Sequence, residues 1–350
     1  MSKIFCFSDT HLGARSNSTE WMSIMEEAHF DFIIPTIKKH FKAGDIIIHC
    51  GDVFDNRTTI NVKVLDLGIR IYEELSKICP VHILAGNHDI YYNSSTEVTS
   101  LDILKYIPNV TIHKEVSILE YNKNKLLMMP WRKNIKEESE TLQKYQSEFE
   151  CDYAFMHGTF SMLKYNKYVD IDDSSGSNPK SARGYKKVLT GHIHWSQQKG
   201  NINNMGTPYQ LTRGDSGNNK GFFVLDLDND TETFYENVIS PKFIQFTVDE
   251  IDKEQLIDIS KQSINNFVDI NIQDKLLSNN STKLTKVFHK IGEKSRVLNI
   301  FPIEQEYDSI DETSSSLDAK ELITREIDNR FKSGDKKKAK KIFDDLIKGI

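Results

Sequence analysis

The chain has 350 residues, of which 38% are hydrophobic and 27% charged, and its formal net charge is −6 at pH 7. The length exceeds what one compact core usually organises, so we expect one large domain with a smaller attachment. The negative charge argues against a protein that coats nucleic acid by positive charge alone, although a metal pair can make one cleft positive.

The composition predicts a cytoplasmic protein without a membrane contact. No apolar run approaches the roughly 20 residues that a spanning helix needs, and the first apolar stretch is too short for a signal peptide. The four cysteines, Cys6, Cys50, Cys79 and Cys151, are scattered and show no CxxC spacing. Buried free thiols are therefore expected.

From residue 3 to about 240, strand-like and helix-like segments alternate. The strand candidates are residues 3–8, 46–50, 81–85, 125–129, 153–157, 185–190 and 221–227. Residues 23–41 and 61–78 have apolar side chains at the three- and four-residue spacing of amphipathic helices. This alternation predicts a sheet covered on both faces by helices.

After about residue 240 the pattern changes. Strand-like residues 243–248, 267–272 and 297–301, with helix-like segments between them, predict a small α+β unit. A polar linker follows at 308–318, and residues 319–331 and 336–347 read as two amphipathic helices. We therefore expect three parts, at residues 1–240, 241–307 and 308–350.

Several strands of the large part are apolar until their last residue and then turn polar. In an open α/β sheet, ligands bind beyond the carboxyl ends of the strands, so these polar residues are the candidates for chemistry. Five such ends read "SDTHLG", "CGDVFDNR", "AGNHD", "MHG" and "TGHIHW". They supply Asp9, His11, Asp52, Asp55, Asn87, His88, Asp89, His157, His192 and His194.

Each element also has an ordinary structural explanation. Asp52 and Asp55 could cap a helix, Asn87 and Asp89 could form a turn, and His157 could be a hydrogen-bonded core histidine. Residues two apart in an extended chain point to the same side, so Asp9 with His11, and His192 with His194, could each reach a metal ion. The set as a whole favours a shared metal centre.

The motifs DxH, GDxxD, GNHD, a lone histidine and GHxH, in this order over residues 1 to about 240, resemble the signature of the calcineurin-like metallophosphoesterase superfamily. The resemblance implies a four-layer α/β/β/α sandwich. It implies one metal ion on Asp9, His11 and His194 and a second on Asn87, His157 and His192, with Asp52 bridging them. His88 would contact the scissile phosphate and assist the leaving oxygen, while Asp55 and Asp89 support the site.

Imidazole, carboxylate and amide oxygen ligands without a thiolate favour manganese, iron or zinc in open sites. We expect two divalent ions, with Mn²⁺ first among them. Many relatives carry histidine where Asp55 stands, which puts a direct role for Asp55 in doubt. An alternative role for Asp55 is to fix the neighbouring loops by hydrogen bonds.

Two further stretches, "GDVFDNR" and residues 205–228, are similar to the SbcD-type double-strand-break-repair nucleases and their phage recombination endonuclease relatives. This resemblance implies a DNA exonuclease or endonuclease subunit that forms a homodimer and acts in the cytoplasm, the host cytoplasm if phage-encoded. Residues 241–307 resemble a capping domain that helps grip DNA. The final helices resemble the segment that docks on an SbcC-type coiled-coil ATPase.

Other functions remain open. One is a small-molecule phosphodiesterase or nucleotidase of the same superfamily, and another is a non-catalytic scaffold. Between residues 332 and 348, seven lysines stand against three aspartates, so the tail could also be a solvated helical pair. An apolar stripe of Ile342, Phe343, Leu346 and Ile347 favours partner docking instead.

Overall fold

The computed structural model describes residues 2–92, 95–303, 336, 338 and 340. The predicted linker and helices at 308–350 lie outside these residues, except for positions 336, 338 and 340. No helix in the described part of the chain is both long and apolar enough to cross a membrane. The four cysteines are free and buried, which confirms that prediction.

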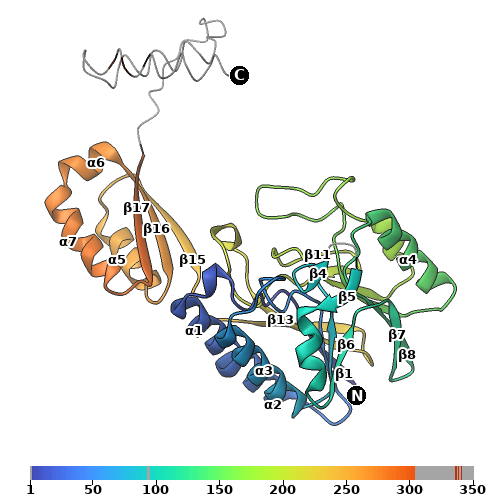
Figure 1. Cartoon of the computed structure of the whole chain (residues 1–350). Coiled ribbons are helices and arrows are strands. Elements are labelled where there is room, and N and C mark those ends of the chain that lie inside the picture. Colours follow the sequence, from blue (N-terminus) through green and yellow to red (C-terminus); the bar gives the residue numbers. More distant parts are fainter. Residues whose placement is uncertain (1, 93–94, 304–335, 337, 339, 341–350) are drawn as a thin grey trace, which may run out of the picture.

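Two six-stranded sheets form the large part of the chain (Figure 1). The first has the order β14-β13-β1-β2-β3-β6, and the second has the order β11-β12-β10-β9-β8-β7. The strands of the first sheet are β1 (Lys3–Phe7), β2 (Ile46–His49), β3 (Val81–Leu84), β6 (Val110–His113), β13 (Gly221–Asp226) and β14 (Thr231–Glu236). Those of the second are β7 (Ser117–Tyr121), β8 (Asn124–Met129), β9 (Tyr153–His157), β10 (Lys187–Gly191), β11 (Gln197–Lys199) and β12 (Ile202–Asn204).

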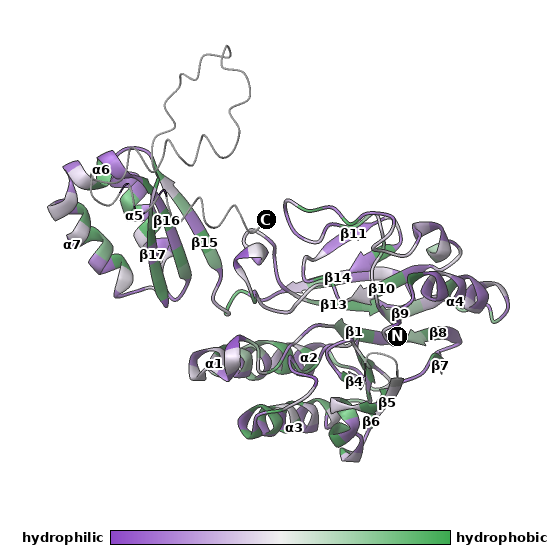
Figure 2. Ribbon diagram, turned by 45° about the horizontal axis from the view of Figure 1, so that its top comes forward, coloured by the Kyte–Doolittle hydropathy of each residue, from purple (hydrophilic) through white to green (hydrophobic). Residues whose placement is uncertain are grey.

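The two sheets pack face to face, and helices cover their outer faces. Cys6 and Ile48 of the first sheet share a buried cluster with Met128 and Phe155 of the second. The first sheet is covered by α1 (Thr19–Glu27), α2 (Ile34–His40) and α3 (Val62–Ser76), and the second by α4 (Ile135–Ser147). Figure 2 shows α1, α2 and α3 grouped on one side of β1, with α4 next to β9 and β8. The predicted four-layer α/β/β/α sandwich is confirmed.

Strand alternation alone predicted one sheet with helices on both faces, and this part was wrong. Phe5 of β1 packs towards the helices, whereas its neighbour Cys6 packs towards the second sheet. Both layers bury apolar side chains, so a run of apolar residues carries no information about which kind of layer covers it. The strands β7 and β14 were missed because they are only partly buried.

The predicted helix at 23–41 is instead α1, a six-residue π-helical turn at Ala28–Ile33, and α2. Ser18 precedes α1 and accepts a hydrogen bond from the Trp21 N–H, which satisfies one free donor of the first turn. The predicted helix at 61–78 is α3, capped in the same way by Asn61. Both segments therefore begin at polar caps.

Residues 243–303 form a small α+β unit. Its parallel sheet contains β15 (Phe243–Val248), β16 (Phe267–Gln273) and β17 (Val297–Ile303). The helices α5 (Lys253–Gln262), α6 (Asp274–Asn279) and α7 (Ser281–Gly292) accompany it and share its own buried cluster. The Trp21 ring of α1 stacks on Phe267 with centroids 5.3 Å apart, and Arg213 pairs with Asp269. These contacts attach the unit to the large part.

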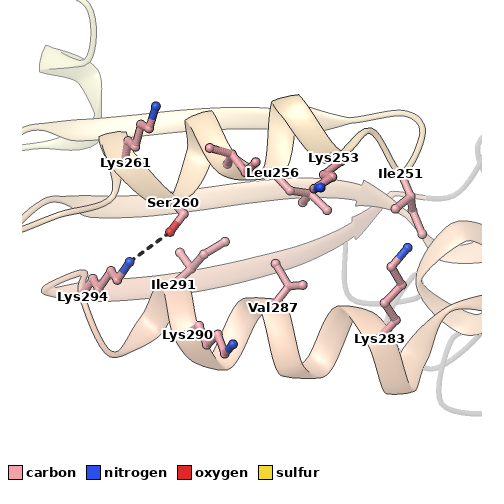
Figure 3. A pocket seen from close by; sticks show the side chains of 11 residues that line it. Ile251, Lys253, Leu256, Ser260, Lys261, Lys283, Val287, Lys290, Ile291 and Lys294 are labelled. Atoms are coloured by element: carbon pink, nitrogen blue, oxygen red, sulfur yellow. Dashed lines mark hydrogen bonds between the residues drawn. The ribbon is translucent and has the colours of Figure 1, made fainter.

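A groove of about 590 Å³ lies between α5 and α7 (Figure 3). Its apolar lining includes Leu256, Val287 and Ile291. Five lysines surround it, Lys253, Lys261, Lys283, Lys290 and Lys294, and none of the described residues that line it carries a carboxylate. This face of the small unit is therefore basic, in contrast to the negative charge of the whole chain.

Candidate metal centre

The loops that follow five strands meet at one edge of the sandwich. After β1 and β2 the chain runs as two adjacent loops, in which the Asp9 N–H donates to Gly51 O at 2.9 Å. The His11 N–H donates to Asp52 O at 3.0 Å. The His192 N–H, just after β10 of the second sheet, donates to the Asp9 carboxylate at 3.0 Å. This contact joins the polar ends of the two sheets.

All seven predicted ligands lie together in this place. Ligand atoms of Asp9, His11 and His194 lie within 4.8 Å of one another, and so do those of Asp52, His157 and His192. Asn87 Oδ1 belongs with the latter group, 3.0 Å from His157 Nε2 and 2.7 Å from His192 Nδ1.

Asp52 lies between the two groups. Its Oδ2 is 3.4 Å from His157 Nε2 and 3.6 Å from His11 Nε2. The geometry is therefore compatible with the bridging position that the resemblance implies. The assignment of each residue to an ion stays a prediction.

His88 lies beside these groups. One of its ring nitrogens is within 4.8 Å of ligand atoms of His11 and Asp52. His88 Nδ1 is 2.6 Å from Asp55 O, and because a carbonyl oxygen only accepts, Nδ1 carries the hydrogen. Nε2 is thereby left available for a substrate.

Asp55 contacts two of the predicted site residues. Besides its carbonyl contact with His88, its Oδ1 is 3.3 Å from His11 Nδ1. Its N–H donates to Leu12 O at 3.1 Å, which ties the loops after β1 and β2 together. These contacts favour an orienting role for Asp55, and that role stays a prediction.

The backbone at the site is not extended, contrary to the prediction that alternation along a strand aligns the ligands. Asp9, His11 and Asp52 have φ values of 56°, 42° and 57°, and His192 has a φ of 88°. Residues other than glycine adopt this left-handed region at a cost, and such residues cluster at functional sites. Loop conformation, rather than strand periodicity, brings the side chains together.

Two glycines make room for the ligands. Gly51 has a φ of 95°, and a Cβ there would lie 2.5 Å from His157 Nδ1. A Cβ on Gly86 would lie 2.2 Å from Asp52 Oδ1. Any other residue at either position would push a predicted ligand out of place.

The donors fit divalent cations. His11 Nε2 and His194 Nε2 face each other at 3.1 Å, so without a proton or a cation between them their lone pairs would repel. The carboxylates of Asp9 and Asp52 are buried, which is costly unless positive charge is close. His157 Nδ1 donates to Cys50 O at 2.7 Å, which directs Nε2 towards Asp52.

In the metal-free protein the buried charges compensate one another. Burial disfavours the ionised Asp52, but His157 and His11 outweigh it and lower the pKa of Asp52 overall. Burial likewise opposes protonation of His157, yet Asp52 and Asp9 raise its pKa to about 9. Burial lowers the pKa of His192 to about 4. A metal ion must displace the His157 proton, so metal affinity should fall as the pH falls.

Asp89 holds the loop that carries Asp52. Its buried carboxylate accepts hydrogen bonds from the backbone N–H groups of Asp52 (2.8 Å), Val53 (3.1 Å), Phe54 (3.2 Å) and Gly86 (3.0 Å). Burial and the nearby Asp52 raise the pKa of Asp89 to about 7. Asp89 therefore fixes the Asp52 loop without facing the two ligand groups itself.

Asp89→Ala should lower the free energy of unfolding by at least about 3 kcal/mol, because four buried N–H groups lose their acceptor. Urea denaturation of the metal-free protein measures the loss. Asp89→Asn keeps one oxygen acceptor and should lose less. Equal unfolding midpoints for Asp89→Ala and the wild type would show that the carboxylate does not hold this loop.

Sequence patterns did not single out a buried ion pair behind His194. Lys220 Nζ donates to Asp215 Oδ1 at 2.7 Å and to His194 O at 2.5 Å. Asp215 in turn accepts from the N–H groups of Leu211 and Thr212. Lys220 and Asp215 lie in a glycine- and asparagine-rich loop without periodicity, so only the fold shows that they orient the backbone at a predicted ligand.

Glu138 of α4 is a buried carboxyl group beneath the loop that follows His157. Its Oε1 accepts from Ser177 Oγ at 2.6 Å. Burial raises the pKa of Glu138 from 4.5 to about 7, against the opposing effect of that hydrogen bond. The folded protein therefore holds this proton more tightly than the unfolded chain does.

It follows that Glu138 makes the protein less stable as the pH rises from about 4.5 to 7, by as much as about 3 kcal/mol. Glu138→Gln should remove this part of the pH dependence and gain stability relative to the wild type at pH 8. Denaturation at pH 5 and pH 8 measures the free energy of unfolding of each variant. Glu140→Gln is the control, because the Glu140 side chain is exposed. A wild-type pH dependence in Glu138→Gln would contradict the expectation.

Comparison with known proteins adds an independent result. The profile of the family described as "Calcineurin-like phosphoesterase" matches residues 2–219. "Exonuclease subunit 1" of Enterobacteria phage T4 is 27% identical over 304 residues, covering 85% of each chain. "Putative phosphoesterase 244L" of Invertebrate iridescent virus 6 is 27% identical over 208 residues, covering 58% of this chain and 71% of the viral protein.

Among solved structures, an archaeal phosphodiesterase aligns with 67% of this chain and 99% of its own, at 14% identity and a TM-score of 0.36. The family match covers well over half of the chain and includes every predicted ligand. The chain belongs to the calcineurin-like phosphoesterase family.

Proposed function

We propose that this chain is the nuclease subunit of a DNA recombination and double-strand-break repair complex and hydrolyses DNA phosphodiester bonds with two divalent cations, Mn²⁺ foremost. The observation that carries the proposal is the meeting of seven carboxylate, amide and imidazole donors at one edge, with His88 beside them. The similarity to a phage exonuclease subunit over 85% of both chains supports a nuclease function.

When bound, two divalent cations would hold the phosphate oxygens and make a bound water nucleophilic near neutral pH. The protein's own hydrogen bonds orient the side chains that would hold these cations. His157 is fixed by Cys50 O, Asp52 is fixed by the His88 N–H at 2.7 Å, and Asp9 accepts the His192 N–H. Asp55 O accepts from the Nδ1–H of His88 and orients the ring, and His88 with both ring nitrogens protonated would donate the Nε2 proton to the leaving oxygen and return to the neutral ring.

The small unit and the tail belong to the same proposal. The basic face around the α5–α7 groove would contact the DNA backbone, since the described residues that line it include five lysines and no carboxylate. The assembly is a homodimer whose residues 308–350 dock on a coiled-coil ATPase of the SbcC type, in the host cytoplasm if a phage encodes the chain. Truncation after residue 311 should abolish co-purification with that ATPase and spare basal nuclease activity. Unchanged co-purification would contradict docking there.

The test compares substrates. Purified protein with Mn²⁺ should cleave end-labelled linear duplex DNA, with and without the ATPase, more efficiently than it turns over a chromogenic phosphodiester. Turnover of the small diester without DNA cleavage would support a small-molecule phosphodiesterase or nucleotidase instead. No turnover and no retained metal after reconstitution would support a non-catalytic scaffold.

A further inference from the structure

The loop between β9 and β10 presents two tyrosines to solvent. The side chains of Tyr165 and Tyr168 are 60% and 82% exposed. They alternate with Lys164 and Lys167 in the sequence "KYNKY". Aromatic rings of this size are usually buried or in contact with a partner, so two of them on one short turn need an explanation.

The turn that carries them is ordered by its own hydrogen bonds. The Tyr165 N–H donates to Val169 O at 2.8 Å, and Asn166 Oδ1 accepts from the N–H groups of Tyr168 (2.8 Å) and Val169 (3.0 Å). The rings therefore project from a defined turn without packing into the core.

The turn is anchored at the metal edge of the sandwich. It begins seven residues after His157, and Phe160, between the two, is buried. Gln197, three residues after His194, accepts from the Lys164 N–H at 2.9 Å and donates to Lys164 O at 2.6 Å. In Figure 1 this yellow-green loop extends close to β11. These contacts attach the turn to the chain that follows His194, on the same edge of the sandwich as the predicted ligands.

The chemistry of the turn suits unpaired bases. Lys167 Nζ lies 5.6 Å from the centroid of the Tyr168 ring, so a cation and an aromatic face are presented together. Bases of a single strand stack on such rings while lysines attract the phosphates, whereas bases inside a duplex already stack on one another. Lys164 Nζ is 3.8 Å from Asp170 Oδ1. An exposed ion pair of this kind is weak, so a phosphate can replace the Asp170 carboxylate.

We propose that residues 164–169 form a base-stacking subsite for unpaired nucleotides beside the metal centre. The proposal rests on the nuclease function proposed above and adds to it a way to hold a single-stranded end. Tyr165 and Tyr168 provide the stacking surfaces, and Lys164 and Lys167 provide the contact with the backbone.

The chain offers a matched control elsewhere. Tyr106 is 76% exposed, and Lys105 Nζ lies 5.1 Å from its ring centroid. It ends the 3-10 helix at Ser100–Tyr106, just before β6, which runs parallel to β3. Tyr106 therefore lies at the amino end of these strands, opposite the metal edge. It is an exposed tyrosine beside a lysine, like Tyr168, but it is not near the predicted metal ligands.

The experiment measures binding of the full chain to a fluorescent single-stranded oligonucleotide and to a blunt duplex, with chelator present to prevent cleavage. The double variant Tyr165→Ala/Tyr168→Ala should bind the single strand at least about ten-fold more weakly and the duplex as the wild type does. Tyr106→Ala should bind both normally, and Tyr168→Trp should keep single-strand affinity. Lys164→Gln/Lys167→Gln should reduce the salt dependence of binding, which the tyrosine variants leave unchanged.

Turnover of the chromogenic diester by each variant shows that the centre is intact. Wild-type single-strand affinity in the double variant, an equal loss in Tyr106→Ala, or equal losses for single strand and duplex would overturn the subsite. A wild-type protein that binds the single strand through these tyrosines but cleaves no DNA would overturn the nuclease function and leave the subsite standing. A protein that cleaves DNA but binds the single strand equally well without the two tyrosines would overturn the subsite and leave the nuclease function standing.

Discussion

His88→Asn is expected to lower kcat for phosphodiester cleavage by at least about 100-fold while the protein keeps its metal ions. His88 lies beside His11 and Asp52 but belongs to neither predicted ligand group, and its Nδ1 is engaged by Asp55 O. Asparagine can keep a polar contact there but cannot deliver a proton to the leaving oxygen. Steady-state kinetics with linear duplex and elemental analysis of the same preparation measure the two quantities.

His289→Asn is the control, because His289 is exposed on α7 of the small unit. It should change neither quantity. Undiminished cleavage by His88→Asn would remove His88 from the mechanism. A loss of bound metal together with activity would instead make His88 a metal ligand, against its proposed role as the proton donor.

Asp52→Asn is expected to have the largest effect on metal binding. The Asp52 carboxylate lies between His11 and His157 and is the predicted bridge, so its neutral substitute removes a negative charge from both ion positions. Mn²⁺ affinity should fall by at least about 100-fold and cleavage should be lost. The pKa of His157 in the metal-free variant should also fall below about 9, because Asp52 is the main charge that raises it.

Isothermal titration with Mn²⁺ measures the affinity, and an NMR titration measures the His157 pKa. Asp45→Asn is a suitable control. Asp45 is also buried and immediately precedes the same strand, β2, at its other end, where it accepts from the Lys3 and Lys42 N–H groups. That variant should bind Mn²⁺ normally. Wild-type affinity in Asp52→Asn would contradict the bridging position.

The sequence was informative where one physical cause dominates. Strands such as β2 and β9 are fully buried and end at a polar residue, so their apolar runs located them within a residue or two. The three strands of the small unit were also predicted, although they are only partly buried and β17 is mostly exposed. The short polar strand β11 has no such signal and was missed.

The candidate site was likewise predicted only in part from the sequence. The residue types and their order after the strands predicted which side chains would gather. Their approach depends on left-handed backbone at Asp9, His11 and Asp52, and on contacts between loops that are distant in sequence. The Lys220–Asp215 pair and the Asp89 carboxylate act through backbone groups, so no pattern of side chains reveals what they hold.

Anomalous diffraction from a crystal soaked in Mn²⁺ is the decisive measurement for the proposed two-metal centre. We predict two peaks roughly 3.5–4 Å apart, one held by Asp9, His11 and His194 and the other by Asn87, His157 and His192, with Asp52 touching both. An empty pocket at saturating Mn²⁺, or ions bound only away from these seven residues, would contradict it.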